Sequence, residues 1–250
     1  MTRFVILTTQ RSGSTVLTRT LDEHPDIFCA GELFHESKAG VHHPEWHFPN
    51  WKLVSGKQSK LNKLVNYPNL KLNAAKHLQK FYKDDSTVKA KGFKLMYSHI
   101  KSSPFIWNYI ASNDVKVIVL IRSNTFKMAL SRYRMEKTGT AHSKDEHISS
   151  SSITVPAQAL LHQTLQLQAV NEKLLSLSAN TNRLVLHYED FGNWTSLMQS
   201  VDGFLDVPFF DAKPVLKKVS GDNWKEEVKN YQEIEEVFKQ HKAEKYLNHS

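Results

Sequence analysis

The chain has 250 residues, and its 40% hydrophobic content is enough to bury one large core or two small ones, which indicates a globular protein. Lysine and arginine exceed aspartate and glutamate by 33 to 25, and the resulting charge of +8 favours anionic ligands without identifying their class. The single cysteine, Cys29, excludes an internal disulfide.

The chain begins almost directly with an apolar, strand-like run, which is too short and too early for a signal peptide. No apolar run approaches the roughly 20 residues that a membrane span needs. One unpaired cysteine is also typical of a reducing compartment. We therefore expect a cytoplasmic protein without a membrane span.

Short apolar runs rich in β-branched residues alternate with longer helical patterns along the chain. Strands are expected at residues 3–9, 92–97, 115–122 and 183–188, with a shorter one at 26–30. Helices are expected at 14–23, 125–137, 156–177 and 224–246. This alternation predicts βαβ units and a parallel sheet covered on both faces. No repeat or linker interrupts it, so a single domain over residues 1–250 is expected.

Two stretches lack this regular pattern. Residues 35–60 are crowded with His, Trp, Pro and Lys, and residues 138–155 form a polar loop with four consecutive serines. Loops of this length are often lids or substrate-contacting segments, although surface disorder fits them equally well. We expect contacts with a substrate within residues 35–90 and 138–155.

The segment Gln10-Arg11-Ser12-Gly13-Ser14-Thr15 lies between the first strand and the first helix. A tight turn at a helix start directs backbone N–H groups and the positive end of the helix dipole at one point, which favours a tetrahedral oxyanion. Hydroxyl groups and the Arg11 guanidinium add further donors. The simpler reading is a turn at Gly13 followed by an N-cap at Ser14.

This loop differs from the nucleoside-triphosphatase signature, because Ser14 follows Gly13 where that signature has lysine. Another strand of those enzymes commonly ends in an aspartate that helps to hold magnesium. Here the strand at 115–122 ends in Arg122. A cation at this strand end favours direct capture of a second phosphate.

These two segments together resemble the PAPS-dependent sulfotransferase family, particularly its bacterial carbohydrate-type members; PAPS is 3′-phosphoadenosine 5′-phosphosulfate. Arg11-Ser12-Gly13-Ser14-Thr15 is similar to the family's 5′-phosphosulfate loop, and Val119-Leu120-Ile121-Arg122 with Ser131 is similar to its 3′-phosphate motif. Further matching segments are Gly31-Glu32-Leu33-Phe34, Gly92-Phe93-Lys94-Leu95-Met96 and Tyr188-Glu189-Asp190-Phe191. The resemblance implies a three-layer fold like that of P-loop NTPases, with a central parallel sheet.

The resemblance also implies a donor, PAPS, and a product, the bisphosphate PAP, with no metal required. The residues it assigns to donor binding are Arg11, Ser12, Gly13, Ser14, Thr15, Val16, Arg122, Ser131, Tyr188, Lys217 and Lys218. Tyr188 would stack on adenine, although a strand tyrosine is as often part of a core. Lys217 and Lys218 fit a degenerate closing segment or a solvated basic face equally well.

Sulfuryl transfer needs charge stabilisation on the leaving phosphate and a base for the acceptor proton. Arg11 and Lys94 are candidates for the first task, and Lys94 fits a solvent-facing strand end equally well. The resemblance points to Glu32 as the base. His99 is the alternative, because a histidine titrates near neutral pH and cytosolic members use one.

The histidines at 35, 42, 43 and 47 suggest a zinc site, but no cysteine pattern accompanies them and their spacing fits no common ligand set. No metal site is therefore expected. The predicted activity is sulfuryl transfer to a hydroxyl of a carbohydrate or other small molecule. The alternatives are a P-loop kinase or hydrolase that uses ATP and magnesium, and a basic nucleic-acid binder, for which no motif is present.

Overall fold

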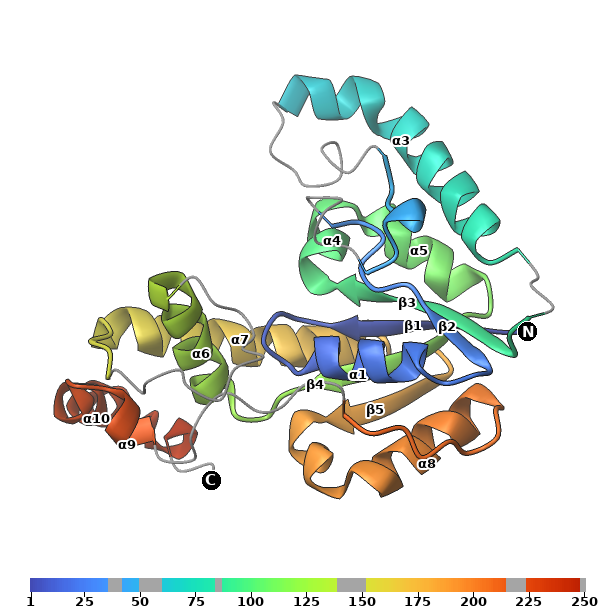
Figure 1. The fold of residues 1–250 in the computed structure, drawn as a ribbon. Helices are drawn as coiled ribbons and strands as arrows, with labels where there is room; N and C mark the ends of the chain where they lie inside the picture. Colours follow the sequence, from blue (N-terminus) through green and yellow to red (C-terminus); the bar gives the residue numbers. More distant parts are fainter. Residues whose placement is uncertain (36–41, 50–59, 84–86, 139–151, 215–223, 248–250) are drawn as a thin grey trace. The chain divides into compact units, whose positions relative to one another are not determined.

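A five-stranded parallel sheet in the order β2-β3-β1-β4-β5 forms the centre of the first of two compact units (Figure 1). The computed structural model describes residues 1–35, 42–49, 60–83, 87–138, 152–214 and 224–247. Unit 1 consists of residues 1–121 and 174–215, and unit 2 of residues 122–173 and 216–250. One domain over the whole chain stays a prediction.

The strands confirm the pattern of apolar runs in the sequence. They are β1 (Thr2–Thr8), β2 (Ile27–Cys29), β3 (Ala90–Met96), β4 (Lys116–Ile121) and β5 (Arg183–His187). Each lies within two residues of its expected bounds. The predicted fold class, a parallel α/β sheet of the P-loop type, is confirmed.

One face of the sheet is covered by α1 (Ser14–Asp22) and α8 (Trp194–Leu205). Leu17 and Leu21 are four residues apart and therefore lie on one side of α1. Both are fully buried in a core that includes Phe4 of β1. This packing positions the start of α1 directly after the carboxyl end of β1.

The opposite face of the sheet carries α3 (Lys60–Phe81) and α5 (Pro104–Ser112), with α4 (Tyr97–Ser102) beside α5. The ring centroid of Phe81 lies 5.7 Å from that of Phe93 in β3. The sequence did not predict these three helices or α8. Residues 35–90 were expected to contact a substrate, and no helix was expected at residues 60–81, where the structure has α3.

The register of β1 against β3 determines which residues of β3 face α1. Phe4 pairs with Gly92 and Ile6 pairs with Lys94. Alternate residues of a strand point to opposite faces, so Gly92 and Lys94 lie on the α1 side while Phe93 points to the other face. This register places the Lys94 side chain near the loop between β1 and α1.

Gly92 is a position where even a methyl group is too large. A Cβ atom built there lies 2.5 Å from three ring carbons of Phe4, which is fully buried. We expect Gly92→Ala to lower the free energy of unfolding by about 1–3 kcal/mol, because the crowded ring has to shift. Urea denaturation measures this change. Gly203→Ala on α8 is the control, because its Cβ meets nothing within 4 Å; an equal loss in both variants would contradict the packing argument.

Unit 2 contains α6 (Thr125–Thr138) and the part of α7 (Ala157–Leu177) up to Lys173. It also contains α9 (Trp224–Glu227), α10 (Tyr231–Gln240) and the short helix η4 (Glu244–Tyr246). Its core is aromatic. The ring of Phe126 lies 4.8 Å from that of Trp224 and 5.6 Å from that of Phe238.

The continuous C-terminal helix expected at residues 224–246 is wrong, because the chain leaves the helical path twice. At the first break, Val228 forms a β-bridge with Ile153, and the Asn230 side chain makes two hydrogen bonds to the backbone of Val155. At the second, Lys242 adopts a left-handed conformation with φ 54°.

Among the described residues, no helix combines the length and apolar character that crossing a membrane requires.

Candidate functional site

The loop between β1 and α1 is held in shape by internal hydrogen bonds. Arg11 and Gly13 have φ angles of 66° and 83°, so the chain turns through two left-handed residues. The Ser12 side chain is fully buried; its hydroxyl donates to the Thr9 carbonyl over 2.8 Å and lies 2.6 Å from the Thr8 hydroxyl oxygen. The Ser12 hydroxyl therefore holds the loop together.

The first helix starts directly at this loop. α1 begins at Ser14 without a side-chain cap, and its first turn contains no acidic residue. The N–H groups of Val16 and Leu17 donate to the Gly13 carbonyl over 3.0 and 3.3 Å. The positive end of the helix dipole therefore faces the loop, as an anion site requires. The predicted contact of Val16 with the donor competes with its bond to Gly13.

Two aromatic rings close over Gly13. A Cβ atom at this position would lie 2.5 and 2.9 Å from Tyr188 ring carbons and 3.0 Å from a Phe191 ring carbon. Tyr188 and Phe191 belong to the short helix η3 (Tyr188–Asn193), and their ring centroids are 5.1 Å apart. The structure therefore brings Tyr188 against the loop between β1 and α1, whereas the sequence had suggested for Tyr188 only adenine stacking or a place in the core.

Three predicted catalytic residues meet beside the loop. The Lys94 Nζ atom lies 2.9 Å from Glu32 Oε1 and donates to the Thr15 hydroxyl over 3.5 Å. His99 Nε2 lies 3.9 Å from Glu32 Oε2. The side chains of Glu32, Lys94 and His99 are only 18, 10 and 13% exposed, so the charges of Glu32 and Lys94 interact in a partly dry environment. Lys94 links Thr15, at the start of α1, to the carboxylate of Glu32, which rules out its alternative role as a solvent-facing strand end.

Backbone contacts with β3 determine the position of Glu32. Ala30 N–H donates to the Gly92 carbonyl over 3.0 Å, and Lys94 N–H donates to the Gly31 carbonyl over 2.7 Å. These bonds extend the β2–β3 pairing beyond Cys29. Gly31 then turns the chain with φ 76°, a conformation that favours glycine. Glu32 is therefore held next to Lys94 by the sheet itself.

The remaining predicted donor residues differ in their surroundings. Arg11 is partly buried, and burial lowers the pKa of its guanidinium, which nevertheless stays charged at neutral pH. Arg122 follows the last residue of β4, is 6% exposed, and its carbonyl accepts a 2.8 Å hydrogen bond from the Asn171 side chain. Ser131 lies on α6, partly buried. Arg122 and Ser131 belong to unit 2. Lys217 and Lys218 lie outside the described residues.

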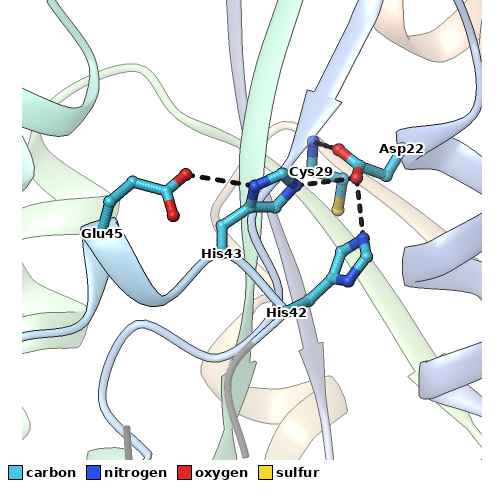
Figure 2. Close-up of polar contacts among 5 residues, drawn as sticks. All are labelled: Asp22, Cys29, His42, His43 and Glu45. Carbon is cyan, nitrogen blue, oxygen red and sulfur yellow. Dashed lines mark hydrogen bonds and ion pairs between the residues drawn. The ribbon is translucent and has the colours of Figure 1, made fainter. Parts of the chain in front are cut away.

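The predicted histidine group divides in two. His47 Nε2 lies 2.9 Å from the His35 carbonyl oxygen. His42 and His43 instead meet Asp22, the last residue of α1 (Figure 2). Sequence reasoning missed Asp22, because it precedes the histidines by about 20 residues and no local spacing connects them. Asp22, His42 and His43 are the group of described residues with the geometry to hold a metal ion.

Comparison with known proteins gives a consistent result. A model of the sulfotransferase family matches residues 3–211. The fold resembles a sulfotransferase from Alicyclobacillus acidocaldarius, with a TM-score of 0.52 and 15% identity over 100% of this chain and 97% of that one. It also resembles the sulfotransferase domain of the Synechococcus PCC 7002 olefin synthase, with a TM-score of 0.53 and 18% identity over 100% and 88% of the two chains.

A third similar structure is the sulfotransferase domain from the curacin biosynthetic pathway. Its TM-score is 0.51 and its identity 15%, over 100% of this chain and 92% of that domain. No curated protein matches the chain significantly. At these identities the structural likeness establishes the fold. The match to the family model covers residues 3–211, and this range includes the loop, Glu32, Lys94 and His99.

Proposed function

This chain belongs to the sulfotransferase family, and on that premise we propose that it moves a sulfuryl group from PAPS to a hydroxyl group of a glycan or other small-molecule acceptor. The observation that carries the proposal is the link from Thr15 through Lys94 to Glu32. One ammonium group touches both an anion-binding loop and a carboxylate. Such a site can stabilise a leaving phosphate and deprotonate an attacking hydroxyl within a few ångströms.

The proposed reaction is an in-line displacement at sulfur. The acceptor oxygen forms a bond to the sulfur atom while the bond from sulfur to the bridging oxygen of the 5′-phosphate breaks. The acceptor proton passes to the Glu32 carboxylate. The electron pair of the broken bond stays on the leaving PAP, where the loop amides, Arg11 and Lys94 stabilise the developing charge.

The ion pair between Lys94 and Glu32 also suggests an order in which donor binding precedes deprotonation of the acceptor. Without donor, its ammonium group pairs with Glu32 at 2.9 Å. A bound phosphosulfate adds negative charge beside Thr15 and competes for the same ammonium group. We infer that donor binding draws Lys94 towards the loop and frees a Glu32 oxygen for the acceptor hydroxyl. Chemistry would then begin only after the donor is bound.

The 3′-phosphate end of the donor is proposed from the family motif. Arg122 and Ser131 match that motif, and Lys217 and Lys218 are the proposed closing lysines. Tyr188 is proposed to contact the nucleotide from its position over Gly13. The basic charge of the chain serves this doubly phosphorylated ligand and not a nucleic acid. A cytoplasmic location, where the donor would have to be supplied, is part of the same proposal.

Removing a proposed phosphate contact should weaken binding of PAP. We expect Arg11→Ala and Arg122→Ala each to raise the Kd for PAP by roughly 10- to 100-fold, because a charge-assisted hydrogen bond contributes about 1.5–3 kcal/mol. Isothermal titration calorimetry in buffer with a chelator measures this change. Arg19→Ala is the matched control, because Arg19 lies in the last turn of α1, away from the loop, and should leave Kd unchanged.

The same titrations separate this function from its alternatives. A wild-type protein that ignores PAP in chelated buffer but binds ATP with magnesium would be a P-loop kinase or hydrolase. A protein that ignores both nucleotides but binds long oligonucleotides, with a steep dependence on salt, would be a nucleic-acid binder. Either result would reject the sulfotransferase proposal.

A further inference from the structure

Three nitrogen and oxygen ligand atoms converge at the end of α1 that lies opposite the phosphate loop. His42 Nε2 and His43 Nε2 each lie 2.8 Å from the same oxygen, Oδ2 of Asp22 (Figure 2). The three ligand atoms all lie within 4.8 Å of one another. Asp22 ends the helix, where the negative end of the helix dipole adds to the attraction for a cation.

Both the carboxylate and one imidazole are oriented by further hydrogen bonds. The backbone N–H of Cys29 donates to Asp22 Oδ1 over 2.9 Å, which leaves Oδ2 to face the histidines. His43 Nδ1 lies 3.2 Å from Glu45 Oε1. A carboxylate behind a histidine, and a hydrogen bond behind a ligating carboxylate, are the arrangements that orient the ligands of metal sites. Cys29 contributes through its backbone, and burial raises the pKa of its thiol, which therefore stays protonated.

His43 has a carboxylate at each ring nitrogen, Asp22 Oδ2 at Nε2 and Glu45 Oε1 at Nδ1. A carboxylate can only accept a hydrogen bond, and a neutral imidazole has a single N–H group, so in that form it can donate to only one of the two. A cation bound to Nε2 and to Asp22 Oδ2 would leave the N–H group on Nδ1 to donate to Glu45.

We propose that Asp22, His42 and His43 bind a zinc ion through Oδ2 and the two Nε2 atoms. Two histidines and a carboxylate form a three-ligand zinc set, which leaves a fourth position for water. Ligand atoms about 2.0–2.1 Å from a tetrahedral zinc ion lie about 3.3 Å apart. The 2.8 Å contacts therefore have to open by a few tenths of an ångström, which small side-chain rotations achieve.

The site is accessible from solvent, and its ligands come from two segments, the end of α1 and residues 42–43. The His42 and His43 side chains are 38 and 24% exposed, so an ion can enter without unfolding. Bound zinc would tie residues 42–46 to the end of α1. His42 also packs against Gly31, whose added Cβ would lie 3.2 Å from His42 Cβ, and Gly31 precedes Glu32. The ion would therefore stabilise the segment that flanks Glu32, without taking part in sulfuryl transfer.

Zinc binding is tested on tag-free, full-length protein. Zinc content after removal of loose ions is measured by mass spectrometry, and affinity by competition with a chromophoric chelator. We expect one zinc ion per chain in the wild type, and loss of that ion in His42→Ala and His43→Ala. Glu45→Gln should keep the ligands but lower the zinc affinity by roughly 10- to 100-fold, as is typical for a partner that orients a ligand.

The matched control is His162→Ala, which removes an exposed histidine of α7 and should keep the zinc ion. Zinc should raise the Tm of the wild type and of His162→Ala but leave that of His42→Ala unchanged. Circular dichroism verifies that every variant is folded. A folded wild type that retains no zinc, or equal zinc content in His42→Ala and His162→Ala, overturns the proposal. Neither result concerns PAP binding, so the sulfotransferase assignment stands or falls separately.

Discussion

Glu32→Gln should lower kcat by about 10²- to 10⁴-fold while changing the Kd for PAP only slightly, because general-base catalysis contributes about that much. Glutamine keeps the shape of the side chain but cannot accept the acceptor proton. The donor contacts of the loop stay in place, since Glu32 touches Lys94 and not the loop itself. Single-turnover rates with saturating donor measure the chemical step, and calorimetry measures donor affinity.

Two comparisons make this result specific. Glu23→Gln replaces an exposed glutamate just after α1 and should leave kcat unchanged. His99→Gln tests the competing base; we expect a smaller loss than for Glu32→Gln, because Glu32 is the proposed base and His99 Nε2 lies 3.9 Å from Glu32 Oε2, beyond hydrogen-bond distance. Full activity in Glu32→Gln with none in His99→Gln would reverse the assignment.

Loss of the ion pair with Lys94 is a second consequence of Glu32→Gln. A partly buried ammonium group without its carboxylate lowers stability. The free energy of unfolding of this variant is therefore measured beside its kcat. A kcat loss in a protein that remains fully folded at the assay temperature is the result that assigns the base to Glu32.

Gly13→Ala should raise the Kd for PAP by roughly 100-fold or more. The left-handed φ of 83° disfavours alanine by about 1–2 kcal/mol, and the new methyl group would overlap the Tyr188 ring at 2.5 Å. Overpacking of this kind adds about 1–3 kcal/mol. Either the loop or the two rings above it must move, and both changes disrupt the proposed phosphate site. Calorimetric titration with PAP measures the effect.

Gly192→Ala is the matched control for this substitution. Gly192 follows Phe191 in the same short helix, but a Cβ atom there meets nothing within 4 Å. Its PAP affinity should equal that of the wild type. Unchanged affinity in Gly13→Ala would show that the close approach of Tyr188 to the loop is unimportant for the donor.

The strands and the turn between β1 and α1 were predictable because their signals are local. Each buried strand is a short apolar run, and residues 10–15 carry a turn, hydroxyl groups and a cation within one segment. Among the helices that were not predicted, α3 contains Pro68, a residue that disfavours a helix interior, so its sequence alone does not indicate a helix. The break before α10 also depends on a distant partner, since Asn230 bonds to Val155.

By itself the sequence determined the parallel α/β class, the position of the loop proposed to bind an anion and the identities of Glu32, Lys94 and His99 as candidates, because strands, turns and short motifs depend on neighbours along the chain. Only the tertiary structure decided that Lys94 joins Thr15 to Glu32, since this depends on the register of β1 against β3. It also decided that Asp22 meets His42 and His43, because a turn at Gly31 and the end of a helix bring them together across the fold. Strand register is set by the packing of the whole core, and no local pattern contains it.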